Sequence, residues 1–336
     1  MSEHRPARAA VFSAGSWGTA AATILADAGT DVVLHARRSE IAEAITSGHR
    51  NPDYFPDIEL PARITATTDP AAALDGADFL VLSVPAQALR HCLAAWTPHI
   101  GPETVIVSLM KGIEQDTHLR ASEIIREVTG VGAARVAVLS GPNLAREIMV
   151  RQPAAATIAC PDEDTARRFQ AACHTQYFRP YTSTDVIGCE MGGALKNVIA
   201  LAVGMATGMG LGDNATALIM TRGLAESTRL ATAMGAMPGT LAGLSGMGDL
   251  VATCSSPLSR NRSFGACLGR GLSVDEAAAE TKQTTEGVKS AEAIIALARA
   301  HGVDMPIAAV VTALLHGKVT LDEAAADLMQ RPPKPE

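Results

Sequence analysis

Short apolar runs alternate with helical patterns through the first half of the chain, and this alternation stops near residue 186. Eight runs predict buried strands, at residues 8–13, 31–35, 63–67, 78–83, 104–108, 135–140, 154–160 and 176–181. Helical patterns lie between them, at residues 17–28, 40–46, 87–95, 119–128 and 164–173. Such alternation, with nearly continuous apolar strands, is typical of a doubly wound parallel sheet covered by helices on both faces. We therefore predict an α/β fold at the N-terminus.

The second half of the chain has only helical patterns, at residues 190–207, 215–234, 274–280, 288–300 and 306–315, with glycine-rich joints between them. The chain has 336 residues, which suffices for two domains at roughly 100–200 residues each. We predict a dinucleotide-binding domain at residues 1–186 and a helical, substrate-binding domain at residues 187–336. Gly204, Gly208 and Gly212 recur every four residues. This spacing indicates close helix packing and then a turn, with Asp213 capping the next helix.

Charge and composition exclude several classes of protein. A formal net charge of -7 argues against nucleic-acid binding, which needs a broad basic surface. The most membrane-like stretch, the sixteen uncharged residues 197–212, is shorter than the roughly 20 residues of a membrane-spanning helix, so no membrane insertion is expected. The six cysteines are scattered without a C-x-x-C pair, which argues against a zinc site and predicts reduced thiols in the cytoplasm.

The first predicted strand runs into a glycine turn and then a helix. A dinucleotide-binding fingerprint has G-x-G-x-x-G here, for a tight turn, close approach of the pyrophosphate, and a close helix–strand contact. Gly15 and Gly18 stand at the second and third glycine positions, and Ser13 stands at the first. The helix that follows offers its N-terminus to an anion. This context favours a Rossmann-like cofactor site over a merely structural glycine turn.

Arg37 and Arg38 follow the second predicted strand, and no carboxylate appears before Glu40. NAD-specific sites usually have Asp or Glu at this strand end, whereas an arginine accommodates the 2′-phosphate of NADP. The pair favours NADP(H), with NAD(H) also open. The alternative is that both arginines are solvated surface charges.

Three polar loops follow the carboxyl ends of predicted strands. Residues 82–87 follow the fourth strand, Lys111 follows the fifth, and residues 140–143 follow the sixth. Ligands of open α/β sheets bind in the crevice at this edge. Together the three loops predict a site there.

Lys196 and Asn197 interrupt an otherwise apolar helical stretch. Such a lysine can extend its ammonium to the surface, or it can lie buried beside a cleft, where desolvation makes it a tunable acid or base. Composition alone favours the surface position. Residues 244–254 predict a polar, glycine-rich loop, which Arg260 and Arg262 follow closely. A phosphate clamp, built on the planar fork of arginine, and a solvated loop are equally open interpretations.

Taken together, these segments resemble bacterial NAD(P)-dependent glycerol-3-phosphate dehydrogenases. The resemblance runs from about residue 10 to residue 300 and rests on AGSWGTA, LSVPAQALR, KGIE, SGPNLAREI, GALKNVIALAVGMATGMGLGDNA, LSGMGDLVATC, SRNR and TTEGVKSA. It implies reversible reduction of dihydroxyacetone phosphate to sn-glycerol 3-phosphate by hydride transfer from NAD(P)H, supplying glycerophospholipid synthesis. It implies a small-molecule substrate and no metal, and it is compatible with a homodimer.

The resemblance also assigns roles to residues. Lys196 matches the catalytic lysine. The substrate would contact Lys111, Gly141, Asn143, Lys196, Asn197, Asp249, Thr253, Ser259, Arg260 and Asn261. The cofactor would contact Gly15, Ser16, Trp17, Gly18, Arg37, Arg38, Tyr54, Lys111, Ala145, Arg260, Thr284 and Glu286.

Two departures from the family pattern stand near these residues. At Ser13 the tight turn must accommodate a Cβ, which points toward a lower cofactor affinity. Asn143 replaces a common hydroxyl residue and can still donate and accept hydrogen bonds. Two other readings stay open, namely a β-hydroxyacid or ketopantoate-type dehydrogenase and a catalytically silent dinucleotide sensor. The SRNR segment argues against the first, and the intact Lys111, Lys196, Asp249 and Arg260 argue against the second.

Overall fold

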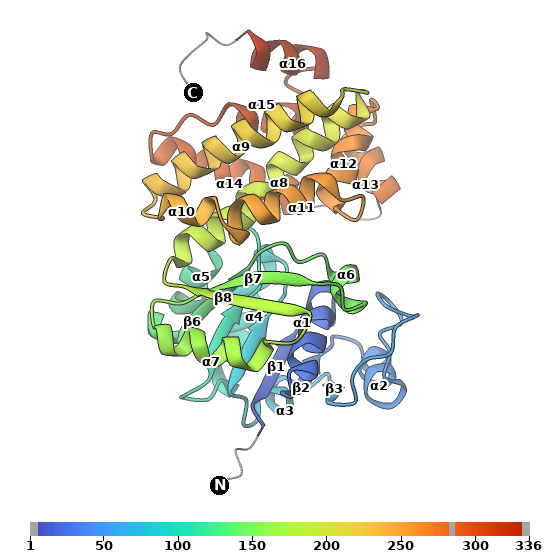
Figure 1. Cartoon of the computed structure of the whole chain (residues 1–336), viewed down its shortest axis with the longest axis vertical. Coiled ribbons are helices and arrows are strands. Elements are labelled where there is room, and N and C mark those ends of the chain that lie inside the picture. The colour runs from blue at the N-terminus through green and yellow to red at the C-terminus, as the bar shows by residue number, and fades with distance from the viewer. Residues whose placement is uncertain (1–5, 282–285, 331–336) are drawn as a thin grey trace. The chain divides into compact units, whose positions relative to one another are not determined.

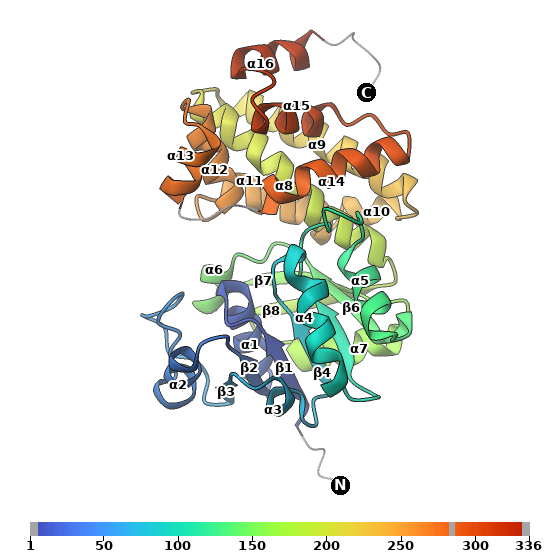
Figure 2. The ribbon, with the colours of Figure 1, turned by 180° about the vertical axis from the view of Figure 1, so that it is seen from behind.

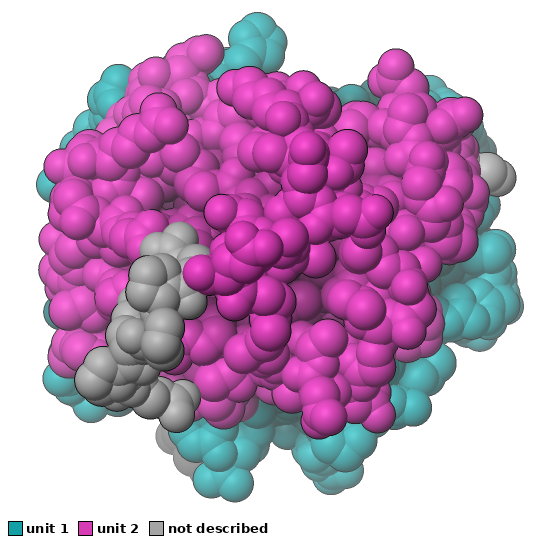
Figure 3. All heavy atoms as spheres, turned by 90° about the horizontal axis from the view of Figure 1, so that it is seen from above, with its two compact units in different colours: residues 1–110, 120–190 teal, residues 111–119, 191–336 magenta. Residues whose placement is uncertain are grey.

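The computed structural model of the chain describes residues 6–281 and 286–330. The chain folds as two compact units, which Figure 3 colours separately. Unit 1 comprises Met1–Met110 and Arg120–Glu190, and unit 2 comprises Lys111–Leu119 and Met191–Glu336. The domains predicted from the sequence, 1–186 and 187–336, place the boundary four residues earlier and assign Lys111–Leu119 to the first domain. The division into a dinucleotide-binding and a substrate-binding domain stays a prediction.

Unit 1 is built on a sheet whose strands follow the predicted apolar runs (Figures 1 and 2). Its strands are β1 (Arg8–Phe12), β2 (Asp31–His35), β3 (Ile64–Thr67), β4 (Phe79–Leu82), β5 (Val105–Ser108), β6 (Val136–Ser140), β7 (Ala154–Ala159) and β8 (Phe178–Ser183). Within the described residues the sheet has the order β3-β2-β1-β4-β5-β6-β7-β8. The chain therefore winds outward in both directions from β1, which confirms the predicted doubly wound sheet.

One strand pair departs from the parallel pattern. β6 and β7 pair antiparallel, with Ser140 opposite Thr157, whereas β7 and β8 are again parallel. The only helix between β6 and β7 is α6 (Ala145–Met149). A helix of this length rises only about 7 Å, too little to return the chain along a strand for a parallel crossover.

Helices cover both faces of the sheet. They are α1 (Ser16–Asp27), α2 (Ser39–Gly48), α3 (Pro70–Leu74), α4 (Leu89–Trp96), α5 (Ala121–Thr129), α6 and α7 (Glu163–Cys173), with short 3₁₀ turns η1 (Ala86–Ala88), η2 (Thr97–His99) and η3 (Ala133–Arg135). The opposite views of Figures 1 and 2 place α7 on one face of the sheet and α4 on the other. The sheet residues Val11, Val81 and Val107 are fully buried, so the core lies against the sheet.

Apart from Lys111–Leu119, which contains no helix, the described part of unit 2 is helical. The long α8 (Val186–Gly208) leads from unit 1 into it, and α9 (Asp213–Ala233), α10 (Pro238–Leu241), η4 (a π-helical turn, Leu244–Gly248), α11 (Asp249–Ser255), α12 (Arg260–Gly269), α13 (Val274–Thr281), α14 (Glu286–Ala300), α15 (Pro306–Leu315) and α16 (Leu321–Met329) follow. The five helical patterns read from this half of the sequence correspond to α8, α9, α13, α14 and α15.

The predicted packing role of the glycine series holds for two of its three members. A Cβ on Gly204 would lie 2.1 Å from the carbonyl oxygen of Arg262, and one on Gly208 would lie 2.3 Å from that of Ala266. The backbones of α8 and α12 therefore touch. Gly212 has an open Cβ position and is itself the N-cap of α9. The prediction that Asp213 caps this helix was wrong, because Asp213 is already its first helical residue.

The length and apolar character of α8 are those of a membrane-crossing helix, with a mean hydropathy of 1.5 in its most apolar window. However, 83% of that window is buried in the described structure, as in the core helix of a globular protein. This helix carries Lys196.

Candidate active site

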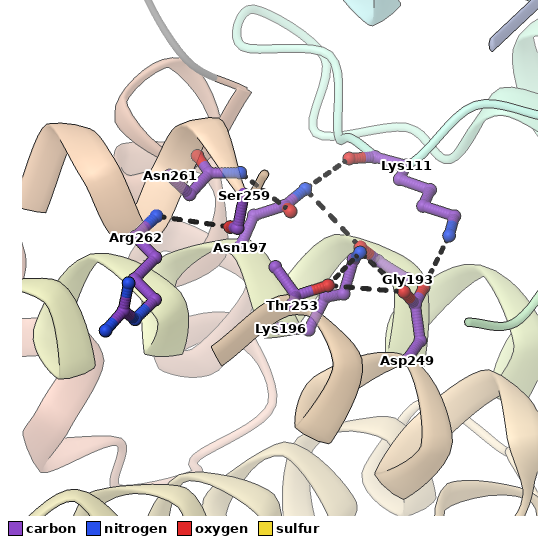
Figure 4. A network of polar contacts seen from close by, with 9 residues as sticks. All are labelled: Lys111, Gly193, Lys196, Asn197, Asp249, Thr253, Ser259, Asn261 and Arg262. Atoms are coloured by element: carbon purple, nitrogen blue, oxygen red, sulfur yellow. Dashed lines mark hydrogen bonds and ion pairs between the residues drawn. The ribbon is translucent and has the colours of Figure 1, made fainter. Parts of the chain in front are cut away.

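Two lysines in unit 2 share one buried carboxylate (Figure 4). Lys196 Nζ donates to Asp249 Oδ1 at 2.6 Å and to Thr253 Oγ1 at 2.6 Å. Lys111 Nζ donates to Asp249 Oδ2 at 2.5 Å. The three groups come from α8, from the start of α11 and from the segment that follows β5. Two ammonium groups against one carboxylate leave one net positive charge, which suits a site that receives or develops negative charge.

Lys196 is only 8% exposed, and Asp249 only 1%. The surface position that composition favoured for Lys196 was therefore wrong. The side chain stays inside because a carboxylate and a hydroxyl satisfy its ammonium there, and a buried charge is tolerated when it is paired in this way. Sequence composition does not reveal those partners, which lie 53 and 57 residues away.

The turn before α11 brings Asp249 against α8. A Cβ on Gly192 would lie 2.4 Å from the carbonyl oxygen of Ser245, so this glycine allows the η4 turn to approach α8 closely. Asp249 begins α11, where its negative charge is also favoured by the helix dipole. Thr253 lies one turn later and contacts both Lys196 and Asp249. The residues predicted as a polar loop are therefore mostly helical.

Burial changes the acidity of the Lys111 ammonium. Burial lowers the pKa of Lys111 to about 8, an effect that the nearby Lys196 ammonium reinforces and that Asp249 opposes. An ammonium with a pKa near neutrality is suited to proton transfer. The arrangement can therefore stabilise a developing oxyanion and give it a proton.

A chain of side-chain amides adjoins the lysine pair (Figure 4). Asn197 donates to the carbonyl oxygen of Lys111 at 3.0 Å and accepts from Asn261 at 3.0 Å. Asn261 in turn accepts from the backbone N–H of Gly287 at 3.0 Å. The amides thus connect α8, α12 and the start of α14 to the backbone of Lys111.

The remaining predicted residues of unit 2 lie near these helix ends. Ser259 is the N-cap of α12, and its hydroxyl accepts from the backbone N–H of Arg262 at 3.2 Å. Arg260 is the first residue of that helix and is exposed. Glu286 begins α14. Thr284 lies outside the described residues.

The glycine turn of unit 1 has the geometry that a dinucleotide requires. Gly15 is the N-cap of α1, whose first turn has no acidic residue. Its leading N–H groups, at Ser16, Trp17 and Gly18, have no partner within the helix and carry partial positive charge. A Cβ on Gly18 would lie 2.0 Å from the carbonyl oxygen of Ser13, so the close helix–strand contact of the fingerprint is present. These residues fit a dinucleotide cofactor.

The two arginines after β2 have different surroundings. Arg38 forms ion pairs with Asp53 and, at 3.5 Å, with Glu40. No hydrogen bond or ion pair joins the Arg37 side chain to another residue of the described ranges, and Arg37 is exposed. Tyr54, next to Asp53, is 44% exposed. These three predicted cofactor residues lie in unit 1.

The loop after β6 carries the other predicted residues of unit 1. Both polar atoms of the Asn143 side chain are buried without a hydrogen-bond partner among the described residues. Buried amides are normally satisfied, so this one is suited to a ligand or a water molecule. Gly141 precedes it, and Ala145 begins α6. Whether Gly141 and Asn143 face the substrate stays a prediction. Among the described residues no group of three His, Cys, Asp or Glu could hold a metal ion.

Sequence reasoning missed a buried ion pair in unit 1. Glu190 accepts from Arg120 Nη1 at 2.6 Å and from the backbone N–H and hydroxyl of Ser122, both at 2.7 Å. Burial raises the pKa of Glu190, and the Arg120 guanidinium opposes that effect. The pair fixes the beginning of α5 against α8, six residues before Lys196. A lone glutamate in an apolar helix was the signal in the sequence.

Comparison with known families covers nearly the whole chain. Residues 8–166 match the family model described as the N-terminus of NAD-dependent glycerol-3-phosphate dehydrogenase. Residues 185–326 match the model described as its C-terminus.

Individual relatives agree with the family models. The chain is 60% identical to "Glycerol-3-phosphate dehydrogenase [NAD(P)+]" of Streptomyces coelicolor, over 99% of both chains. It is 62% identical to the protein of the same name from Thermobifida fusca, over 98% of both. Among solved structures, glycerol-3-phosphate dehydrogenase from Coxiella burnetii matches with a TM-score of 0.91 and 35% identity, over 97% of this chain and 99% of that one. A ketopantoate reductase from Ralstonia eutropha, at 19% identity and a TM-score of 0.59, shares only the fold.

Proposed function

Because the chain belongs to the NAD-dependent glycerol-3-phosphate dehydrogenase family, we propose that the lysine pair of unit 2 is its catalytic centre. The protein is an oxidoreductase that reduces dihydroxyacetone phosphate to sn-glycerol 3-phosphate, reversibly and with NAD(P)H. The product supplies glycerophospholipid synthesis. The ketopantoate-type alternative is set aside by the family match, since its likeness is one of fold.

We assign the role of general acid to Lys196. Negative charge develops on the ketone oxygen during reduction, and the Lys196 ammonium stabilises it and gives the proton. Positioned acid catalysis of this kind typically contributes about 10²–10⁴-fold. The observation that carries the assignment is the burial of Lys196 with its Nζ 2.6 Å from both Asp249 and Thr253, which fixes the ammonium in one orientation.

Lys111 and Asp249 support this acid. Asp249 holds both ammonium groups and lowers their mutual repulsion. Lys111 adds positive charge beside the developing oxyanion. The side-chain amide of Asn197 is hydrogen-bonded to the backbone of Lys111 and to the side chain of Asn261. We therefore propose that Asn197 acts mainly by positioning Lys111 and contributes less to substrate contact.

The phosphate of the substrate would be held at the start of α12. Arg260 offers a planar fork there, and the N-terminus of this ten-residue helix adds a favourable dipole. Ser259 and Asn261 flank Arg260. Gly141 and Asn143 are proposed as further substrate contacts, and the orphaned amide of Asn143 supports that role.

The cofactor would be held by the first turn of α1 and by the residues after β2. Gly15, Ser16, Trp17 and Gly18 would bind the pyrophosphate, and Arg37 and Arg38 the 2′-phosphate of NADP. Tyr54, Lys111, Ala145, Arg260, Thr284 and Glu286 are proposed as further contacts. When bound, the nicotinamide supplies the hydride. We propose NADP(H) as the preferred form.

The setting of the enzyme is proposed from the same premise. The scattered, unbridged cysteines support a reducing compartment, and we propose the cytoplasm. We propose no nucleic-acid partner and no membrane insertion, and we propose a homodimer as the assembly to test.

Substitution of the acid tests the proposal. Lys196→Ala should lower kcat for dihydroxyacetone phosphate by about 10²–10⁴-fold, because the oxyanion loses its proton donor. NADPH affinity, measured by titration calorimetry, should stay within about twofold, since Lys196 is not among the proposed cofactor contacts. Lys318→Ala, at an exposed lysine, is the matched control. A Lys196→Ala enzyme with normal kcat would overturn the assignment.

A further inference from the structure

Ser13 has a backbone conformation that side chains rarely adopt. Its φ is 104°, deep in the region that favours glycine. A residue held there is strained, and it persists only when its surroundings impose the conformation. Such an outlier beside a binding loop calls for a functional explanation.

The backbone of Ser13 is fixed on both sides. Its N–H donates to the carbonyl oxygen of His35 on the neighbouring strand at 3.3 Å. Its own carbonyl oxygen lies only 2.0 Å from the point where Gly18 would carry a Cβ, so it packs directly against α1. The turn therefore imposes the positive φ on whichever residue stands at position 13.

The hydroxyl of Ser13 lies where the fingerprint brings the cofactor. The second glycine of the fingerprint has no Cβ, so the pyrophosphate can approach the backbone through the space that a Cβ would occupy. The second glycine here is Gly15, and a Cβ placed on it would lie 3.2 Å from Ser13 Oγ. Leaving out the residues adjoining Gly15, no other atom of the described chain lies within 4 Å of that Cβ. No described protein group is hydrogen-bonded to this hydroxyl.

We propose that Ser13 is a pyrophosphate ligand. Its strained backbone places the side-chain hydroxyl beside the unpaired N–H groups at the start of α1. The hydroxyl donates to a pyrophosphate oxygen. This reverses the expectation from the sequence that a Cβ at position 13 lowers cofactor affinity. The inference rests on the cofactor site of the proposed function, and it concerns binding alone.

Two substitutions separate the hydroxyl from the backbone. Ser13→Ala keeps the Cβ and the strained φ and removes only Oγ. Ser13→Gly removes the hydroxyl and also relieves the strain. Titration calorimetry of the intact enzyme with NADPH, NADH and ADP-ribose should give Kd values raised about tenfold or more in both variants, as for loss of a hydrogen bond to a charged group. The factor should be equal for the three ligands, which share the pyrophosphate.

Thermal unfolding without ligand supplies the second measurement. Ser13→Ala should keep the wild-type Tm, which shows that weaker binding is not a folding defect, and Ser13→Gly should raise it. Wild-type Kd values in both variants would overturn the proposal, as would a loss confined to NADPH, which would place the hydroxyl at the 2′-phosphate. Failure of the proposed function would instead appear as no NADPH oxidation by the wild-type enzyme with dihydroxyacetone phosphate.

Discussion

At the scale of single residues, Asp249 determines how the two lysines of unit 2 work together. Each of its oxygens receives one ammonium group, Lys111 at 2.5 Å and Lys196 at 2.6 Å. Without the carboxylate that both of them contact, the two buried ammonium groups would repel each other, which favours loss of a proton from one of them. The shared aspartate therefore offsets the repulsion between the two ammonium groups, and the three groups together carry one net positive charge, which suits the proposed oxyanion.

The lowered pKa of Lys111 gives a pH dependence. Below about pH 8 Lys111 is an ammonium, and above it the charge is lost. We expect kcat/KM for dihydroxyacetone phosphate to be level below pH 8 and to fall as the pH rises through it, because the oxyanion loses part of its stabilisation. Lys111→Arg, whose guanidinium stays charged, should move the fall to higher pH. A wild-type profile that is flat to about pH 10 would contradict this role for Lys111.

Arg260 is expected to govern phosphate recognition. Arg260→Ala should raise KM for dihydroxyacetone phosphate about tenfold or more, because a charge-assisted fork to the phosphate is lost. Arg262→Ala is the matched control, since the guanidinium of Arg262 points away from the lysine pair in Figure 4. Steady-state kinetics measure both. Equal KM values in the two variants would contradict the clamp.

At the scale of elements, the site depends on how closely α8 and α12 approach. Gly204 and Gly208 on α8 face Gly265 and Gly269 on α12, and a Cβ at any of the four would lie 2.1–2.3 Å from a backbone carbonyl oxygen of the other helix. This contact places the start of α12, with the residues proposed to bind phosphate, against the helix that carries Lys196.

Gly204→Ala tests the helix contact. The added methyl would lie 2.1 Å from a backbone oxygen that cannot move without shifting α12, so we expect a loss of about 1–3 kcal/mol in the free energy of unfolding. KM for dihydroxyacetone phosphate should rise as well, because α12 begins at Arg260. Denaturant titration measures the stability. The control is Gly239→Ala in α10, where no atom lies within 4 Å of the new Cβ. Equal stability of the two variants would exclude the close contact.

The elements also show what sequence could and could not predict. The strands of the sheet were predicted because a buried strand in a doubly wound sheet is a continuous apolar run. The antiparallel β7 was not, since an apolar run carries no direction. Helix α11 and the start of α12 were taken for a loop, because glycines and polar residues dominate residues 244–262 and the burial that stabilises these helices comes from α8.

The site was predictable in its members more than in its geometry. Lys111, Lys196 and Asp249 were identified by resemblance, whereas their shared ion pair joins residues 138 and 53 positions apart and follows only from the fold. The strain at Ser13 is a further case. Its unusual residue was visible in the sequence, and its φ was not.

At the scale of the whole molecule, the two units carry complementary chemistry. Unit 1 holds the glycine turn and the arginines proposed for the cofactor, and unit 2 holds the lysine pair and the proposed phosphate clamp. Reduction of a phosphorylated ketone requires both sets. A dinucleotide sensor would need only the cofactor residues of unit 1, so the buried lysine pair of unit 2 favours an enzyme.

Initial rates with two ketones most directly test whether the enzyme reduces a phosphorylated ketone. NADPH oxidation by the wild-type enzyme would be followed with dihydroxyacetone phosphate and with unphosphorylated dihydroxyacetone, and again with NADH. We expect rapid oxidation of NADPH with the phosphorylated ketone alone, and a higher kcat/KM for NADPH than for NADH because of Arg37 and Arg38. Comparable rates with both ketones, or none with dihydroxyacetone phosphate, would contradict the assignment of a phosphate-anchored ketone reduced beside Lys196.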